Sequence, residues 1–564
     1  MDGRSIEQDI AAAAASVGGN GEYETSPEQP PPDDRPPDAD GTPAVVLGTD
    51  EYRCVIQTIN AMAADPTIYH RGGCLVRVDR NGDGARIGLL PRASLRERIT
   101  KHTRIVVNKL VKKEWEQVPA HPPNWLVEAI EARGDWPGLR PINSISDSPI
   151  LRPDGTVCQD PGYDAASGVL YEPTAEFPAI PPDVGPDDAD WALAQLLEVV
   201  EDFSFEGPEH RAAWLAGLLT PFARFAFAGP SPLFLIDANI RGAGKGLLAQ
   251  AIGHVVLGRE MPPSSYTDDA EEMRKQITSL AIGGDRMFHM DNVTGDFGNA
   301  AMDRALTSGR WKDRILGGNR EVDLPLLATW YATGNNVAIA ADTARRIIHC
   351  RLDVLSEKPE ERTGFAHPEL TAWILSERPR LVVACLTILR AYFAAGRPRA
   401  SGILPYGSFE GWSRLVREAI IWLGQPDPCL TRLGLAERSD TTGDALGQLL
   451  QAWREYSPTG GVYISEMMAR LYAAQFRPTD EASTAMRNAL ETLTSAPLGR
   501  VPTAKSVGRK LSAIRRTVRD GLLIDYDPDA NDKRGKAWRL YSVESKSSVS
   551  ANPVQQSQTQ IEFK

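Results

Sequence analysis

The stretch that decides the fold is PLFLIDANIRGAGKGLLA, residues 232–249. It joins a short apolar run, residues 233–236, to a glycine-rich turn and then to an apolar helical pattern that begins near Lys245. Glycine lets a turn point several backbone N–H groups at one anion, and the N-terminus of the following helix adds positive potential. The order strand, glycine-rich loop and helix therefore predicts a P loop, with Lys245 reaching the β- and γ-phosphates of ATP.

The loop departs from the usual P-loop pattern at two positions. Asn239 stands where the first glycine is expected, and it tolerates a positive φ less freely than glycine. Gly246 replaces the serine or threonine that usually touches Mg²⁺, so either a water fills that position or the metal binds more weakly. A glycine-rich turn with a surface lysine is the simpler alternative. The ATP-binding residues are predicted to be Asn239, Arg241, Gly242, Ala243, Gly244, Lys245, Gly246 and Leu247.

Two further apolar segments end in residues suited to ATP hydrolysis. Residues 287–290 lead to Asp291, where a strand-end carboxylate would hold Mg²⁺ through water, although a capping aspartate is the alternative. Asn292 replaces the usual glutamate, and an asparagine can orient a water but cannot take its proton. Residues 326–331 lead to Asn335, which is placed to hold the lytic water or the γ-phosphate.

A pair of arginines, Arg345 and Arg346, follows ten residues after that asparagine and precedes an apolar run. Such a pair is either a solvated cap or an arginine finger that stabilises charge on the transferring phosphoryl group. Strand-like and helix-like segments alternate from residue 232 to about 354, which predicts an α/β layer fold.

The order of these motifs resembles the superfamily 3 branch of the AAA+ helicases, and most closely the primase–helicases of phages, plasmids and poxvirus-like viruses. The elements that carry the resemblance are the P loop, Asp291-Asn292, and residues 305–310, 314–317, 333–336 and 342–346. The resemblance implies a homo-oligomeric ring, with a hexamer favoured, that holds ATP and Mg²⁺ between subunits. It implies that Arg345 or Arg346 reaches the neighbour's ATP, and that Lys312, Arg314 and Arg320 touch DNA in the pore. The family's primase module is not evident, so a separate primase or polymerase is an expected partner.

Basic residues gather near the C-terminus of a chain whose net charge is −12. The pattern predicts a helix over residues 504–519, stopped by Gly521 and followed by a hairpin. Four apolar residues should face the core: Val507, Leu511, Ile514 and Val518. A helix followed by a basic hairpin resembles a winged-helix module that binds DNA, and a solvated amphipathic helix is the alternative. The predicted DNA contacts are Arg509, Lys510, Arg515, Arg516, Arg519, Lys533, Arg534 and Lys536.

The 564-residue chain is predicted to be an AAA+ P-loop ATPase core of α/β class between two smaller domains. The N-terminal domain is mixed α+β and shows no catalytic constellation, and the C-terminal domain is winged-helix-like. The predicted segments are an acidic disordered tail (1–43), the N-terminal domain (44–171), a proline-rich linker (172–188), the ATPase core (189–358), a helical region (359–436), the C-terminal domain (437–545) and a second disordered tail (546–564).

Six scattered cysteines without a C-x-x-C pair predict buried, reduced thiols, and no run suits a signal peptide or a membrane span. The sequence therefore favours a cytoplasmic protein, bacterial or in the host cytoplasm if phage-encoded. The expected function is an ATP-dependent DNA helicase or DNA-remodelling motor in replication of a phage or mobile element. One alternative is an ATP-binding initiator, loader or regulator with little turnover, because Asn292 and Gly246 lack the usual acid and hydroxyl. A small-molecule P-loop kinase is the other.

Overall fold

The computed structural model describes residues 41–542 apart from 82–83, 295, 316–320, 356–357, 433–434, 436–440, 459, 473–479, 495–500 and 533–534. The two predicted disordered tails lie outside the described residues, except for residues 41–43. Arg320, Lys533 and Arg534, three of the predicted DNA contacts, also lie outside them.

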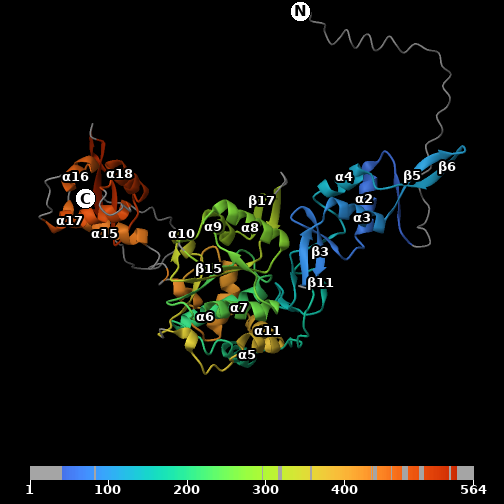
Figure 1. The fold of residues 1–564 in the computed structure, drawn as a ribbon, viewed down its shortest axis with the longest axis horizontal. Helices are drawn as coiled ribbons and strands as arrows, with labels where there is room; N and C mark the ends of the chain where they lie inside the picture. The colour runs from blue at the N-terminus through green and yellow to red at the C-terminus, as the bar shows by residue number, and fades with distance from the viewer. Residues whose placement is uncertain are drawn as a thin grey trace, which may run out of the picture.

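A five-stranded parallel sheet lies at the centre of the chain, as the alternating pattern predicts (Figure 1). Its strands are β13 (Leu233–Ala238), β14 (Pro263–Ser265), β15 (Met287–Val293), β19 (Thr329–Asn335) and β21 (Ile347–Leu352). Their spatial order is β14-β15-β19-β13-β21, and every neighbouring pair is parallel. The carboxyl ends of all five strands therefore meet at one edge of the sheet.

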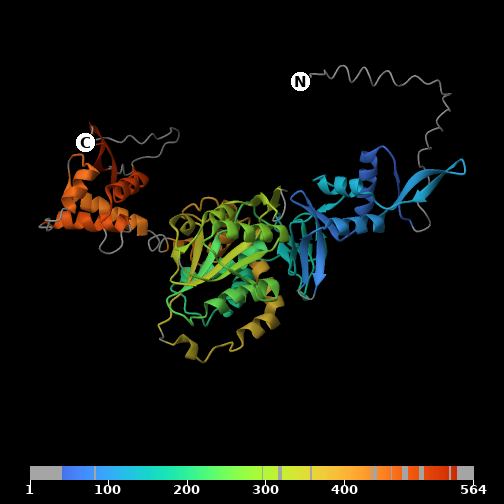
Figure 2. The same ribbon diagram turned by 45° about the horizontal axis from the view of Figure 1, so that its top comes forward.

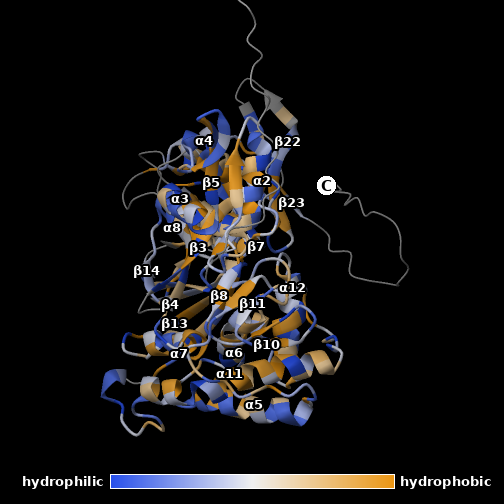
Figure 3. Cartoon of the chain, turned by 90° about the vertical axis from the view of Figure 1, so that its right-hand side faces the viewer, coloured by the Kyte–Doolittle hydropathy of each residue, from blue (hydrophilic) through white to orange (hydrophobic). Residues whose placement is uncertain are grey.

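Helices cover both faces of this sheet, as parallel sheets require. One face packs on α5 (Pro186–Glu198), α6 (Pro208–Ala223), α7 (Lys245–Leu257) and α11 (Leu370–Ala394) in a single core that extends to Cys429. The predicted helical region from residue 359 thus shares the core of the sheet. Figure 3 shows both hydrophobic and hydrophilic residues along α5 and α11, which pack on each other, with α11 also packing on α6 and α7.

The opposite face of the sheet packs on α8 (Ala270–Gly283) and α9 (Ala300–Thr307), and on the antiparallel hairpin of β17 (Arg310–Arg314) and β18 (Glu321–Pro325). The segment before α5, predicted as a linker, contains no helix or strand from residue 172 to 185, but its Ile180 and Val184 are buried in the first core. This segment therefore lies against the core of the central sheet over part of its length.

The N-terminal part contains two small sheets. In the first, β1 (Ala44–Leu47), β5 (Arg104–Val111) and β6 (Glu114–Pro119) pack with α2 (Glu51–Met62), α3 (Arg92–His102) and α4 (Asn124–Ala132). In the second, β2 (Ile68–Arg71), β3 (Cys74–Asn81), β4 (Gly84–Leu89) and β7 (Arg140–Pro141) form the order β4-β3-β2-β7. Strands β3 and β4 form a hairpin, in which they pair antiparallel up to Asn81 and Gly84.

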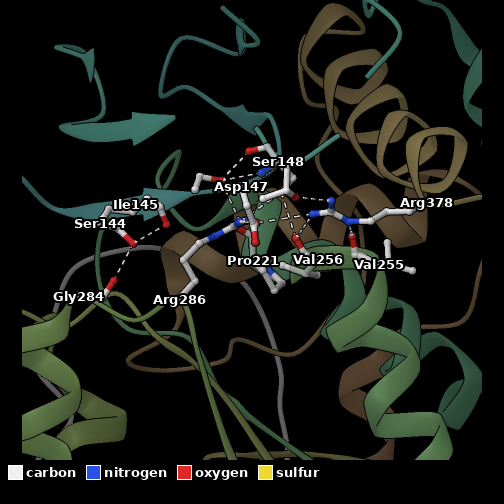
Figure 4. Close-up of polar contacts among 12 residues, drawn as sticks. Ser144, Ile145, Asp147, Ser148, Pro221, Val255, Val256, Gly284, Arg286 and Arg378 are labelled. Atoms are coloured by element: carbon white, nitrogen blue, oxygen red, sulfur yellow. Dashed lines mark hydrogen bonds and ion pairs between the residues drawn. The ribbon is translucent and has the colours of Figure 1, made fainter. Parts of the chain in front are cut away.

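Short strands lead from these sheets to the core of the central sheet: β8 (Ser144–Ser146), β9 (Ile150–Leu151), β10 (Val157–Cys158), β11 (Gly162–Asp164) and β12 (Val169–Tyr171). Between β8 and β9, Asp147 lies beside two buried arginines of the core, 3.4 Å from Nη1 of Arg286 and 3.6 Å from Nη2 of Arg378 (Figure 4). Arg378, on α11, also donates to the last carbonyls of α7, Val255 (3.1 Å) and Val256 (3.1 Å). One carboxylate thus joins the N-terminal part to two elements of the core.

Neutral oxygens complete this buried junction. Arg286 donates to the Ser146 hydroxyl (2.8 Å) and to the Pro221 carbonyl in α6 (3.3 Å), and the Ser144 hydroxyl donates to the Gly284 carbonyl (2.6 Å) (Figure 4). A third buried arginine, Arg71 of β2, donates to the carbonyls of Ala281 (3.1 Å) and Pro325 (2.9 Å) in the core. These buried donors are no longer hydrated. The loss of any one partner would therefore leave a buried polar group without a hydrogen bond.

The described residues of the C-terminal part form four helices followed by a hairpin, with a core of their own and at a distance from the central sheet in Figures 1 and 2. They are α15 (Thr441–Tyr456), α16 (Ile464–Leu471), α17 (Glu481–Thr494), α18 (Ala504–Ala513), β22 (Leu522–Asp532) and β23 (Gly535–Ser542).

The predicted helix over residues 504–519 is too long, because α18 ends at Ala513. Arg516 has a φ of +62°, and its N–H donates to the Ile524 carbonyl of β22. Val518, expected in the core, is 51% exposed, whereas the other three predicted core positions are buried. A tertiary contact therefore replaces the last predicted helical turn.

All six cysteines are buried and unlinked, which confirms the prediction of buried thiols. Among the described residues, no helix is both long and apolar enough to cross a membrane.

Candidate nucleotide-binding site

The P loop joins β13 to α7 at the carboxyl edge of the sheet. Gly242 and Gly244 have φ values of +77° and +86°, and Gly244 is the N-cap of α7. A Cβ on Gly244 would lie 3.1 Å from Cε1 of Phe203, so both the backbone and the space require glycine there. The first-turn N–H groups of α7 have no partner within the helix, and they can bind an anion at this end.

Asn239, the first departure from the P-loop pattern, is not among the described residues with positive φ, so no glycine is needed there. Its side chain ties the loop to the chain beyond β21. The amide nitrogen donates to Oδ1 of Asp353 (2.8 Å) and to the Val354 carbonyl (2.9 Å), and Oδ1 accepts the Val354 N–H (3.1 Å). The asparagine therefore fixes one side of the loop by side-chain hydrogen bonds.

Three predicted catalytic residues meet at this edge because β19 lies between β13 and β15. Lys245 Nζ donates to Oδ1 of Asn335 at 2.7 Å. Asp291 Oδ1 accepts from the Thr333 hydroxyl at 2.6 Å, and the same hydroxyl accepts the N–H of Asn292 at 2.9 Å. The Asp291 side chain is 48% exposed, so its carboxylate retains lone pairs for a hydrated metal ion.

Burial lowers the pKa of Lys245, while the charges of Asp237 and Asp291 act in the opposite direction. The ammonium has thus lost part of its hydration shell and lies beside the amides of the P loop. A partly desolvated cation is stabilised by an anionic partner, so the site suits a phosphate group.

The second departure, Gly246, leads to a test of the metal site. A Cβ at Gly246 would meet no atom within 4 Å, so a serine fits without rearrangement. We expect Gly246→Ser to add a hydroxyl ligand and to lower, about threefold to tenfold, the Mg²⁺ concentration that half-saturates nucleotide binding. Titration of Mg²⁺ at a fixed concentration of fluorescent ATP analogue measures this shift. Gly246→Ala is the matched control, and an equal shift in both variants would assign the effect to helix stability.

A buried network beneath the P loop was not foreseen. Nη1 of Arg351, on β21, contacts Oδ2 of Asp237 (2.5 Å), and Nη2 donates to Oδ1 of Asn336 (2.8 Å). Burial alone would raise the pKa of Asp237, but the hydrogen bond from His349 and the charge of Arg351 outweigh it and lower the pKa. The only signal in the sequence was the presence of charged residues within two apolar strands.

A hollow of about 350 Å³ lies beside the P loop, and no motif in the sequence pointed to it. Phe203, which packs against Gly244, is one of its walls, and Phe205 is another. The remaining lining residues are Ala194, Leu197, Glu198, Val200, Glu201 and Arg211. Its aromatic walls, next to the glycine-rich turn, suit a flat, partly apolar group.

The two arginines after β19 differ in environment. Arg346 is buried, with Nη1 3.1 Å from Oδ1 of Asp303 and 3.0 Å from Oδ2 of Asp342. The Arg345 side chain is 64% exposed, and its ion pair among the described residues is with the 59% exposed carboxylate of Asp342, at 2.7 Å. Of the pair, Arg345 is the more exposed side chain.

The β17–β18 hairpin presents basic residues to solvent. Trp311 and Asp313 point inward, whereas Arg310, Lys312 and Arg314 are exposed. Lys312 lies 3.4 Å from Glu321 across the hairpin, and both side chains are more than half exposed. This exposed pair leaves the lysine available to a phosphate.

The basic residues around α18 fall into two groups. Arg515 and Arg516 each place Nε 2.5 Å from one oxygen of the buried Asp525, so they hold the hairpin against the helix. Arg509 and Lys510 are exposed, and no ion pair to either occurs within the part of the chain that the structure describes. The second group is therefore the better candidate surface for DNA.

No family model and no curated protein matches the chain. Among solved structures, the chain is similar to the apo C-terminal region of NrS-1, with a TM-score of 0.35 and 12% identity over 84% of this chain and 95% of that one. It is also similar to a JCV helicase bound to a small organic compound, with a TM-score of 0.19 and 15% identity over 43% of this chain and 74% of that one. Both scores are low, and the interpretation of the site depends on its own geometry.

Proposed function

We propose that the chain is an ATP-dependent motor that acts on DNA, a helicase or DNA-remodelling enzyme. The observation that carries this proposal is the meeting of Lys245, Asn335 and Asp291 around a P loop at one sheet edge. The P-loop amides and the Lys245 ammonium would hold the β- and γ-phosphates, and Asn335 would orient the attacking water. Asp291 would hold a hydrated Mg²⁺, which when bound neutralises charge on the phosphoryl oxygens.

The hollow beside Phe203 supports a nucleotide as the ligand. Phosphates seated on Gly242–Lys245 would leave the base of the same molecule close to Phe203, because that ring touches the turn. Aromatic and aliphatic walls bind a purine face, and the polar rim can contact its edge. This arrangement favours ATP over inorganic phosphate alone.

We infer that the active form is a homo-oligomeric ring in which Arg345 reaches the nucleotide of the next subunit. Its exposure supports this role, while Arg346 is committed to Asp303 and Asp342 in its own chain. A hexamer is the favoured assembly, in the cytoplasm of a bacterium or of a phage-infected host. Replication of a phage or mobile element, with a separate primase or polymerase, is the proposed setting.

DNA would contact the exposed residues of α18 and the β17–β18 hairpin. We expect Arg509→Ala with Lys510→Ala to weaken DNA binding and to reduce the salt slope of log K by about 0.9 for each lost phosphate contact. The fold should be unaffected, since both side chains are exposed. Fluorescence anisotropy at a series of salt concentrations measures the slope.

The double variant with Arg515→Ala and Arg516→Ala is compared with the Arg509 and Lys510 variant. It removes both partners of the buried Asp525, so it should lower the melting temperature of the C-terminal part. An unchanged salt slope in the Arg509 and Lys510 variant would remove α18 from the DNA-binding surface.

An ATP-controlled initiator or loader with little turnover is the second candidate. Asn292 favours it, because an amide at this position cannot accept a proton from water. Its N–H is also engaged by Thr333, so its backbone holds the strand end in place.

ATP hydrolysis with and without single-stranded DNA, combined with a mass measurement in nucleotide, tests the proposal. A motor should show turnover that DNA stimulates, an assembly larger than a monomer, and strand displacement on a forked duplex. ATP-dependent assembly without turnover or displacement would favour the initiator, and no nucleotide binding would exclude both.

A further inference from the structure

The hairpin of β5 and β6 extends beyond the rest of the N-terminal part as a two-stranded arm (Figures 1 and 2). β1 pairs with β5 only along Arg104–Val107, whereas β5 and β6 pair with each other as far as Val111 and Glu114. We call residues 108–117 the arm. They lack the third strand and the helix cover that stabilise most hairpins.

Two lysines form the tip of the arm in an unfavourable conformation. Lys112 and Lys113 have φ values of +50° and +74°, which are typical of the two central positions of a type I′ turn. Glycine, asparagine and aspartate are the usual residues there, because other side chains crowd the backbone. Both lysines are exposed, and no ion pair to either occurs among the residues that the structure describes. The backbone of the tip is therefore strained, and its two ammonium groups are unpaired within the described chain.

An apolar pair lies directly behind the tip on one face of the arm. Leu110 and Trp115 are cross-strand partners, and they are 50% and 37% exposed. Neither packs into any of the cores formed by the described residues. An exposed tryptophan beside free lysines is suited to a ligand that has both flat apolar surfaces and negative charge.

The charge of the surrounding part agrees with such a ligand. Residues 44–141 contain 15 basic and 11 acidic residues, a net charge of +4, although the whole chain has −12. An anionic ligand would therefore be attracted to this part of the molecule despite the acidic remainder.

We propose that the arm binds single-stranded nucleic acid, with Lys112 and Lys113 on the phosphates and Trp115 stacked on a base. Stacking on an exposed aromatic ring requires an unpaired base, which favours a single strand over a duplex. The arm is distant from the P loop in sequence and in the fold, so this binding does not depend on the proposed ATPase activity.

The strained tip allows a test that separates binding from folding. Lys112→Asn with Lys113→Gly removes both charges and supplies the residues that a type I′ turn prefers, so the melting temperature should be unchanged or higher. Binding of the full chain to fluorescein-labelled oligothymidine, measured without nucleotide, should weaken on the order of tenfold, and the salt slope should fall by about 0.7 for each lost contact. Lys112→Arg with Lys113→Arg keeps the charges and should retain affinity.

Variants of Trp115 give a second, independent test. Trp115→Ala should weaken binding of the single strand about tenfold and Trp115→Phe much less, with little effect of either on a duplex of the same length. Oligouridine in place of oligothymidine distinguishes RNA from DNA as the preferred single strand, and tighter binding of either supports the proposal. Unchanged affinity and salt slope in the Asn-Gly variant would overturn it. A change in oligomer mass without a change in nucleic-acid binding would also overturn it, because the arm would then contact another copy of the chain.

Discussion

Replacing Lys245 with alanine is expected to reduce ATP turnover by about a hundredfold to a thousandfold, the usual cost of losing one group that stabilises transition-state charge. Lys245 is the cation at the start of α7, and its Nζ lies 2.7 Å from Asn335 at the edge where the phosphates would lie. Phosphoryl transfer depends on such positioned charges, since the protein supplies little covalent chemistry. Steady-state hydrolysis at saturating ATP and single-stranded DNA measures the loss.

Lys275→Ala is the matched control for this variant, because Lys275 is a surface lysine on α8 whose ion pair in the described part of the chain is with the exposed Glu272. The control should hydrolyse ATP at the parent rate. Lys245→Ala should melt near the parent temperature, since the hydrogen bond to Asn335 is its single described polar contact. Parent-like turnover in Lys245→Ala would show that hydrolysis occurs elsewhere.

The second large effect is expected on stability. Arg286→Ala should lower the free energy of unfolding by about 3–5 kcal/mol, because it leaves the Asp147 carboxylate without its nearest arginine in a buried site. It also removes the donors to Ser146 and Pro221. Urea unfolding followed by tryptophan fluorescence measures the change.

Arg92→Ala provides the contrast, since Arg92 makes ion pairs to Glu128 and Glu131 from a side chain that is 60% exposed. That variant should lose at most about 1 kcal/mol. Adding Asp147→Asn to Arg286→Ala should recover part of the loss, because it removes a carboxylate that would keep only the more distant Arg378, at 3.6 Å, as a charged partner. Equal effects of Arg286→Ala and Arg92→Ala would mean that the junction does not hold the two parts together.

Much of the central α/β fold could be predicted because its signals are local. The apolar run before the glycine-rich turn, and the apolar segments before Asp291 and Asn335, each become strands that end at the predicted residue or just past it. The junction to the N-terminal part could not be predicted in this way. Arg71, Arg286 and Arg378 are arginines, which are usually exposed, and only the tertiary structure supplies the carbonyls and the carboxylate that bury them.

The end of α18 shows the same limit. Ile514 and Val518 continue the helical spacing, so the pattern alone extends the helix to Arg519. Asp525 on the following strand instead attracts Arg515 and Arg516, and the chain leaves the helix to reach it. The spacing of apolar residues cannot predict that an ion pair with a distant carboxylate will replace the last turn of a local helix.

The candidate site was predicted in outline and differs in detail. The sequence gives no way to distinguish Arg345 from Arg346. The structure shows that Arg345 is exposed, whereas Arg346 is buried and paired with Asp303. The hollow beside Phe203 comes from the helical lead-in, which carries no motif. Its role depends on contact with the P loop, which is a property of the fold.

A structure of the chain with Mg²⁺ and a non-hydrolysable ATP analogue tests the central claim most directly. The account predicts the triphosphate on the amides of Gly242–Lys245, with Mg²⁺ and its waters between the phosphates and Asp291, and with the base beside Phe203. Nucleotide bound away from this turn, or a metal ion held without Asp291, would contradict it.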